Sequence, residues 1–492
     1  MAKRRAEDDE DGGVSLKGGE RPPNVEAGEN IEGFEDDFED EYESEDEIME
    51  AGVDGRPDQE RLAEEKDNAM DVDKRTFIPG RDRLPNGEVL SPDLSSYEML
   101  HTLSATWPCL SFDIVPDSLG DNRKSYPATL YAVAGTQAQS QRARDNELLA
   151  MKLSSLSRSE RLDEEESEDD DDSDEAVEPI LETRSIPLSS TTNRIRAHKF
   201  ASDTSSSSPQ VLAATMLESA ELQIFDVSSH LRSFDVPGTV ITPTQSRPVA
   251  NLKVHRSEGY AIAWSPLYAE GRLLSGDNDG KIFVHTQEPT GKWISDTRPF
   301  TGHQGSVEDV QWSPNELNVF ASASSDGTVK IWDLRSKSRK AAVSVQVSAT
   351  DVNVLDWSSQ TPHLLATGAD DGVFAIWDLR QWKPLSNSTP MGEAKPAPPE
   401  PVARFDYHKE QITSLEWHPT DDSTLCVAAG DNTVTLWDLA VEFDDEESKG
   451  SGAVDGVPPQ LLFVHYMENI KEGHWHPQIP GVVMATGGAG FG

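Results

Sequence analysis

Short apolar runs separated by turn residues recur along the chain from about residue 107 onward. The clearest stretch, residues 302–333, alternates such runs with glycine, asparagine, proline and aspartate, a pattern typical of β-strands. Within it, Asp326-Gly327 supplies residues that tolerate positive φ in a tight hairpin, so the strands on either side pair antiparallel. The pattern therefore predicts a series of short antiparallel strands.

A tryptophan motif repeats through this region. Its four copies are Trp264-Ser-Pro, Trp312-Ser-Pro, Trp357-Ser-Ser and Trp417-His-Pro. The copies are 48, 45 and 60 residues apart, yet in the last three a Trp-Asp-Leu tripeptide follows after 20 residues, at Trp332, Trp377 and Trp437. A fixed internal spacing with variable distances between units indicates a rigid module joined by unequal loops, and such a module is one blade of a β-propeller.

Weaker copies bring the expected number of blades to seven. They occupy residues 126–153, 211–226 and 461–477. The sequence thus predicts an all-β, seven-bladed propeller over residues 106–492, closed by a strand from the other end of the chain, for which Pro108–Val115 is the expected donor. The last copy ends before a Trp-Asp equivalent, so either the sequence is truncated or that blade is one strand short.

A buried hydrogen-bonded tetrad is expected in the clearest blade, since His303, Ser322, Asp326 and Trp332 fall where WD-repeat blades place one. Other copies retain parts of it: Thr367 and Asp371 before Trp377, with no histidine near Ser348; His408 and Asp431 before Trp437, with Val427 replacing the serine; and His255, Ser275 and Asp279 in the third blade, with Phe283 and His285 in place of Trp-Asp. Such decay indicates that the tetrad is scaffold and not chemistry.

Acidic segments surround this ring. The formal net charge is -46, with eleven acids in residues 35–50, twelve in residues 163–178 and five in Glu442–Glu447. Blocks of like charge repel one another and bury little apolar surface, so they should be solvated and mobile. We therefore expect an acidic disordered tail at 1–90, an N-terminal helix at 91–105, acidic insertions at 157–183 and 441–458, the former between the first two blades, and a Pro-rich loop at 384–401.

The charge restricts the class of partner. One acidic run is compatible with simple solubility, but three favour binding to something basic. Direct nucleic-acid binding is disfavoured, because phosphate would be repelled and Lys3-Arg4-Arg5 is too short to offset the charge. With no signal core and no apolar stretch long enough for a membrane span, we expect an intracellular monomer that contacts no membrane.

The sequence predicts no enzyme, no metal and no cofactor. It contains neither a nucleophile elbow nor a glycine-rich phosphate loop. His465, His474 and His476 suggest zinc at first, but Trp-His-Pro also recurs at Trp417-His418-Pro419 as part of the blade pattern. The only cysteines, Cys109 and Cys426, are far apart, which excludes a disulfide framework and a clustered thiolate site.

Several segments outside the repeats resemble the glutamate-rich WD-repeat proteins, the ribosome-assembly branch of the histone-binding WD-repeat family. They are residues 95–103, 107–114, 126–127, 134–137, 151–153, 193–196 and 458–465. The resemblance implies a nuclear and nucleolar chaperone that binds a newly made basic protein of the large ribosomal subunit, the one called L-three, for 60S assembly. It implies histone binding more loosely.

A client groove is expected at the start of the propeller. Asp93 or Ser95 can cap a helix whose Tyr97, Leu100 and Leu103 share one face by their i, i+3 spacing. In the histone-binding relatives, an N-terminal helix and an acidic Pro-Pro loop between the last two blades clamp a basic amphipathic helix. The residues here that match that loop are Asp444, Asp445, Glu446, Glu447, Pro458 and Pro459. The alternative is that the helix only covers the propeller side.

A second binding surface is suggested by two consecutive Trp-Asp-x-Arg blades. Asp333 with Arg335, and Asp378 with Arg380, resemble the surface by which substrate receptors dock on the adaptor of cullin-4 ubiquitin ligases. The alternative is that each arginine simply ends a strand on one face of the ring, as is common in WD repeats.

Overall fold

The structure is a computed structural model that describes residues 90, 92–159, 178–200, 209–383, 399–441, 457–488 and 490–492. These residues all lie in one compact unit, Thr76–Gly492. Their strands form seven antiparallel sheets, each of four strands except the third, which has five. The predicted seven-bladed propeller is therefore confirmed.

We number the sheets in chain order by their innermost strands. The first three contain β2 (Cys109–Ile114), β3 (Ala128–Thr136), β4 (Glu147–Leu156) and β5 (Ile180–Pro187); β6 (Thr192–Lys199), β7 (Val211–Leu217), β8 (Leu222–Asp226) and β9 (Ala250–Leu252); and β10 (Ala261–Trp264), β11 (Arg272–Gly276), β12 (Lys281–Gln287), β13 (Trp293–Ser295) and β14 (Phe300–Thr301).

The other four sheets follow the same order. They contain β15 (Val307–Trp312), β16 (Val319–Ser324), β17 (Thr328–Asp333) and β18 (Val343–Gln346); β19 (Val352–Trp357), β20 (Leu364–Ala369), β21 (Phe374–Asp378) and β22 (Ala403–Phe405); β23 (Ile412–Trp417), β24 (Thr424–Ala429), β25 (Thr433–Asp438) and β26 (Leu461–Tyr466); and β27 (Glu472–Trp475), β28 (Val483–Thr486), β29 (Gly490–Phe491) and β1 (Leu103–Ser104). The described helical elements are η1 (Leu94–Ser96), η2 (Ser140–Asp145), α2 (Ser228–Asp235) and η3 (Leu379–Gln381).

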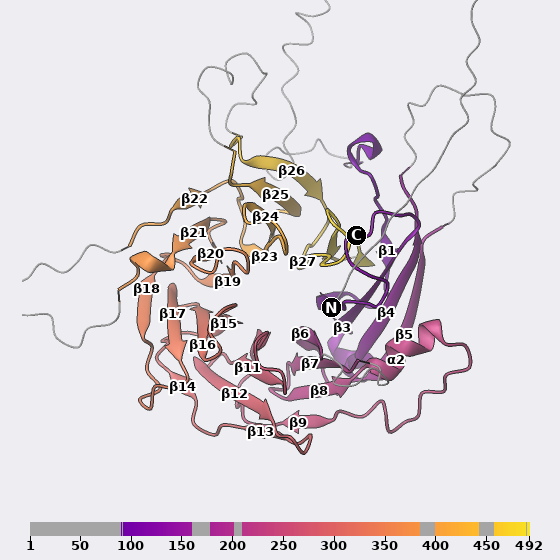
Figure 1. Cartoon of the computed structure of the whole chain (residues 1–492), viewed down its shortest axis with the longest axis horizontal. Coiled ribbons are helices and arrows are strands. Elements are labelled where there is room, and N and C mark those ends of the chain that lie inside the picture. Colours follow the sequence, from indigo (N-terminus) through magenta and orange to yellow (C-terminus); the bar gives the residue numbers. More distant parts are fainter. Residues whose placement is uncertain are drawn as a thin grey trace, which may run out of the picture. The chain divides into compact units, whose positions relative to one another are not determined.

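The sheets are arranged around a central axis (Figure 1). Each innermost strand contacts the innermost strand of the next sheet, and β27 contacts β2, which completes the circle. The apolar core lies between the sheets: one cluster joins Phe374 of the fifth sheet to Leu425 and Trp437 of the sixth, all fully buried. Burial between neighbours explains how blades with degenerate motifs remain folded.

The strand that closes the ring differs from the prediction. β1, Leu103–Ser104, pairs with β29 and forms the outer edge of the seventh sheet. The predicted donor, Pro108–Val115, instead contains β2, the innermost strand of the first sheet. The seventh sheet has four strands, so the expectation of a missing strand was wrong, although β29 contains only two residues and no Trp-Asp pair.

The predicted helix over residues 91–105 was also wrong. Asp93 does cap a helical turn, because its Oδ1 accepts a hydrogen bond from Ser95 N at 3.1 Å, but this turn, η1, ends at Ser96. Tyr97 is already extended, and Leu103 pairs with Phe491. The i, i+3 apolar spacing is real, yet hydrogen bonds to the neighbouring strands replace those of a helix.

The two acidic insertions lie within sheets. The segment predicted at 157–183 connects β4 to β5 of the first sheet, not the first blade to the second, and it ends earlier than predicted because Ile180–Thr183 already pairs with β4. The segment predicted at 441–458 likewise connects β25 to β26 of the sixth sheet, instead of joining the last two blades. Residues 1–89, 160–177, 384–398 and 442–456 lie outside the described residues, which include most of both insertions and of the Pro-rich loop.

The expected tetrad is present in the fourth sheet. His303 Nε2 lies 2.7 Å from Ser322 Oγ, and His303 Nδ1 lies 3.1 Å from Asp326 Oδ2. Trp332 Nε1 donates to the same Ser322 Oγ at 2.8 Å, and the indole is fully buried. Because every buried polar atom of the set has a partner, the tetrad stabilises the blade.

Two other sheets rebuild the tetrad with different residues. In the sixth, Thr435 supplies the hydroxyl that Val427 cannot: its Oγ1 accepts from Trp437 Nε1 at 2.8 Å and lies 3.0 Å from His408 Nε2. In the third, His255 bonds Asp277, and the predicted Asp279 was wrong, because its side chain is partly exposed and pairs with Lys281.

Candidate functional site

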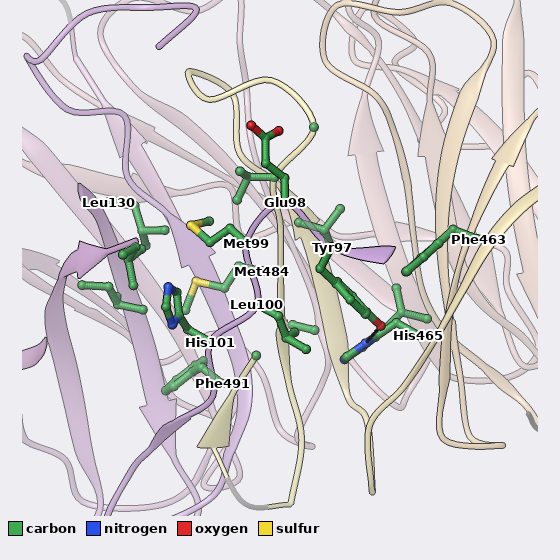
Figure 2. Close-up of a pocket in the computed structure, with 18 of the residues that line it drawn as sticks. Tyr97, Glu98, Met99, Leu100, His101, Leu130, Phe463, His465, Met484 and Phe491 are labelled. Atoms are coloured by element: carbon green, nitrogen blue, oxygen red, sulfur yellow. Dashed lines mark hydrogen bonds between the residues drawn. The ribbon is translucent and has the colours of Figure 1, made fainter. Parts of the chain in front are cut away.

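An apolar cavity of about 390 Å³ lies where the N-terminal segment crosses the sixth, seventh and first sheets. Residues 96–101 and Leu103 form one wall, β26 supplies Phe463 and His465, and the seventh sheet supplies Met484 and Phe491. Figure 2 shows Tyr97, Leu100 and Met99 directed among these side chains, while Glu98 points away from them. We call this cavity the N-terminal groove.

Tyr97 joins the N-terminal segment to β26. Its hydroxyl lies 2.7 Å from His465 Nδ1, and its ring meets Phe463 edge to face, with 5.1 Å between the centroids. Burial lowers the pKa of His465 and raises that of Tyr97, so the imidazole is neutral and the phenol donates the hydrogen bond. Neither group is charged at neutral pH, which keeps this end of the groove apolar.

The other end of the segment is attached to the first sheet. Leu100 N donates to Ser159 Oγ at 2.9 Å, and Ser159 N donates to the carbonyl oxygen of Glu98 at 3.0 Å. His101 Nε2 lies 2.9 Å from the carbonyl oxygen of Ser157. These bonds to the residues just after β4 hold the wall of the groove in extended form.

The structure brings the three predicted apolar residues to one groove. Tyr97 and Leu100 are half-buried there, whereas Leu103 is buried and belongs to the closing strand β1. Of the predicted loop, Pro458 is half-buried and Pro459 exposed, immediately before β26. Asp444, Asp445, Glu446 and Glu447 lie outside the described residues.

Sequence reasoning missed the wall that faces Tyr97. Phe463 and His465 alternate on β26, so both point to the same face of that strand, and Leu462 between them is 54% exposed. The alternation was readable, but its partner was not, because the contact depends on the register between β25 and β26 across the acidic segment.

Comparisons with known proteins agree with this architecture. A family model for histone-binding protein RBBP4, or the equivalent component of the CAF1 complex, matches residues 87–157, which include the N-terminal wall of the groove. The model for the WD domain, G-beta repeat, matches residues 295–333, 343–378 and 399–438. Ribosome assembly protein rrb1 of Schizosaccharomyces pombe is 44% identical over 462 residues, 93% of this chain and 91% of its own length.

Two further relatives match over most of their length. Glutamate-rich WD repeat-containing protein 1 of Dictyostelium discoideum is 39% identical over 502 residues, 99% of this chain and 95% of its own. The chain belongs to the glutamate-rich WD-repeat family. Protein HEAT STRESS TOLERANT DWD 1 of Arabidopsis thaliana is 44% identical over 453 residues, 85% of this chain and 91% of its own.

In this glutamate-rich WD-repeat protein the two Trp-Asp-x-Arg arginines share one geometry. Arg335 Nε donates to Asp333 Oδ1 at 2.9 Å, and Arg380 Nε donates to Asp378 Oδ1 at 2.9 Å. The hydrogen bonds from Arg380 lower the pKa of Asp378 to about 2, so its carboxylate is ionised. Both arginine side chains are about two thirds exposed, at 66% and 68%.

The described part of this family member contains no group of three or more His, Cys, Asp and Glu side chains placed to hold a metal ion. His474, one of the three histidines weighed for zinc, instead lies 2.7 Å from a carboxylate oxygen of Glu416. Among the described residues, no helix is long and apolar enough to cross a membrane.

Proposed function

We propose that this protein acts in ribosome biogenesis, in the nucleus and nucleolus, as a non-enzymatic chaperone of a newly made basic protein of the large subunit, L-three. The observation that carries the proposal is the groove framed by acidic sequence. The name of the fission yeast relative, a ribosome assembly protein, supports the same process. A strongly basic client would meet a partner of net charge -46, which favours rapid encounter and disfavours competing nucleic acid.

In this proposal the client presents an amphipathic helix to the N-terminal groove. Apolar side chains of the helix enter the cavity between Tyr97, Leu100 and Phe463, where there is room for a few of them in about 390 Å³. Basic residues on its other face pair with Asp444–Glu447, which precede β26 and hence the far wall. Apolar burial then supplies affinity, and charge supplies orientation and rate.

Truncating the groove is expected to weaken client binding. Phe463→Ala should raise the dissociation constant for the purified ribosomal protein about 30-fold, because it removes an aromatic wall from the centre of the interface. Isothermal titration calorimetry at physiological salt measures this. Leu462→Ala is the matched control, since that side chain lies on the same strand but is 54% exposed, and its affinity should equal that of the unmodified protein. Equal affinities for all three proteins would remove the groove from the interface.

The acidic segment provides the second arm of this experiment. Charge reversal of Asp444–Glu447 to lysine should abolish detectable binding while the propeller remains folded. Combined with Leu100→Ala, a weaker reversal of two acids should cost less than the sum of the separate losses if one client helix bridges both elements. Leu103→Ala is unsuitable for this purpose because Leu103 also closes the ring. Retained binding by the four-residue reversal would place the client elsewhere.

A histone is the alternative client of the same groove, and the histone-binding family model over residues 87–157 favours it. Direct competition separates the two: the client with physiological relevance should displace the other at equal concentration. Phe463→Ala should weaken both if they share the groove.

Docking to the adaptor of a cullin-4 ubiquitin ligase is the second candidate function. The exposed arginines of two consecutive blades favour it, because each presents free guanidinium donors beside an ionised aspartate. Arg335→Ala combined with Arg380→Ala should abolish co-purification with the adaptor and leave the affinity for the ribosomal client unchanged. Adaptor binding that survives the double substitution would exclude this surface.

A further inference from the structure

The fifth sheet keeps most of a tetrad around a missing histidine. Thr367 Oγ1 accepts from Trp377 Nε1 at 3.0 Å, as Ser322 does from Trp332 in the fourth sheet. Asp371 Oδ1 accepts from Val373 N at 3.2 Å, the same turn that Asp326 Oδ1 makes with Thr328 N at 3.0 Å. The hydroxyl, the carboxylate and the indole are thus in place, but a serine, Ser348, stands where the other sheets have histidine.

The backbone identifies Ser348 as the equivalent position. A glycine in the hairpin of each preceding sheet packs against the carbonyl oxygen at this position: Gly280 against His303, Gly327 against Ser348, and Gly372 against His408. All three residues also stand four before the first residue of their innermost strand, Val307, Val352 and Ile412. The main chain of the fifth sheet is therefore held as in its neighbours, and only the ring is absent.

A cavity of about 360 Å³ occupies this place. It is lined by Ser348, Thr367, Asp371, Val373 and Trp377, which correspond to the surroundings of the fully buried His303 and His408 side chains. Exposed residues at its edge, among them Gln346 and Arg404, show that it reaches the surface. Within the described residues, no donor bonds Asp371 Oδ2, the atom whose counterparts in Asp326 and Asp431 bond the histidine.

We propose that this cavity is a binding site for an imidazole ring, presented as a histidine side chain by a partner polypeptide. In the filled sheets the ring lies 2.7 and 3.0 Å from the hydroxyl and 3.1 and 3.0 Å from the carboxylate, so one nitrogen bonds each group. Thr367 and Asp371 offer the same pair. Arg404 beside Asp371 offsets its charge, which favours a neutral ring over lysine or arginine.

The ring has to come from another molecule. All twelve histidines of the sequence lie within the described residues, and none of them lines this cavity. The site is independent of the N-terminal groove and of the proposed client.

Free imidazole is the first probe, at pH 8, where the neutral ring predominates. The full-length protein should bind it saturably with a dissociation constant on the order of millimolar, measured by the shift of the Trp377 indole N–H resonance. Ser348→Ala leaves the cavity open and should bind equally well. Ser348→His supplies the ring in place, so binding should disappear and the melting temperature should rise by about 2 °C. Equal binding by wild type and Ser348→His, or none by wild type, would overturn the proposal.

Peptides test whether a polypeptide can deliver the ring. N-acetyl-Gly-His-Gly amide should bind at least about tenfold more tightly than the Gly-Phe-Gly and Gly-Arg-Gly peptides, and Asp371→Asn should reduce that preference, because the carboxylate accepts the ring N–H. Preference for the arginine peptide would show a general cation site, and binding of imidazole but of no peptide would show that no partner histidine can reach the cavity; either result contradicts the assignment. If Ser348→His is unfolded, loss of imidazole shifts in Thr367→Val carries the same test.

Discussion

Replacing Glu472 with glutamine is expected to lower the free energy of unfolding by about 3–5 kcal/mol, because it removes the anion from a buried ion cluster. Glu472 lies on β27 of the seventh sheet and forms ion pairs with Arg194 and Arg196 of the second. It also accepts hydrogen bonds from Ser111 Oγ at 2.9 Å and Phe112 N at 3.0 Å in the first. One carboxylate thus connects three sheets across the closure of the ring.

The effect should be large because the arginines cannot regain water. Their side chains are only 12% and 21% exposed, and that of Glu472 is 3% exposed. Glu468→Gln is the matched control: Glu468 is an exposed acid just after the sixth sheet, and its loss should change stability by less than about 0.5 kcal/mol. Chemical denaturation at neutral pH measures both. Equal stability of the two variants would show that the cluster contributes nothing to closure.

The same difference should depend on pH with a definite sign. Burial alone would raise the pKa of Glu472, but the charges of Arg196 and Arg194 outweigh it and hold that pKa well below its ordinary value of 4.5. A depressed folded-state pKa contributes stability that is present above about pH 4.5 and is lost as the pH falls further. The gap between wild type and Glu472→Gln should therefore narrow below pH 4.5.

The fold was predictable because the repeat sets it. The 20-residue interval from Trp312 to Trp332 contains three strands and two turns, and neighbouring copies repeat it, so blade number and strand order follow from spacing. The closing strand did not follow, since β1 and β29 contain two residues each, too few for any alternation to show. The helix was mispredicted for a related reason: apolar spacing at Tyr97, Leu100 and Leu103 fits a helix, but the hydrogen bonds that decide come from residues far along the chain.

The site was predictable in part for the same physical reason. Tyr97, Leu100 and Leu103 were found because they are close in sequence, whereas Phe463 and His465 required knowledge of which strand lies opposite. A local signal did exist for the rebuilt tetrad: Thr435 stands two residues before Trp437, and strand periodicity places both side chains on one face. The hydroxyl was instead expected on the neighbouring strand, at the position that Val427 occupies.

Trp332→Ala is expected to destabilise the propeller by about 3–5 kcal/mol, because it deletes a fully buried indole and leaves a cavity between two sheets. The ring packs against Phe300 of the third sheet and Phe320 of its own, at centroid distances of 5.6 and 6.0 Å. Its loss also removes the Nε1 donor to Ser322, so His303 keeps a hydroxyl with one partner fewer.

Two variants separate packing from hydrogen bonding at this position. Trp332→Phe keeps an aromatic ring but not the donor, and it should cost clearly less than alanine, about 1–3 kcal/mol. Leu317→Ala removes a side chain that is 41% exposed in the same sheet and should be near neutral. Thermal and urea unfolding of the four proteins should then rank them wild type and Leu317→Ala first, Trp332→Phe next and Trp332→Ala last. If Trp332→Ala unfolds with the wild type, the indole does not anchor the fourth sheet, and the tetrad around it is not what stabilises the blade.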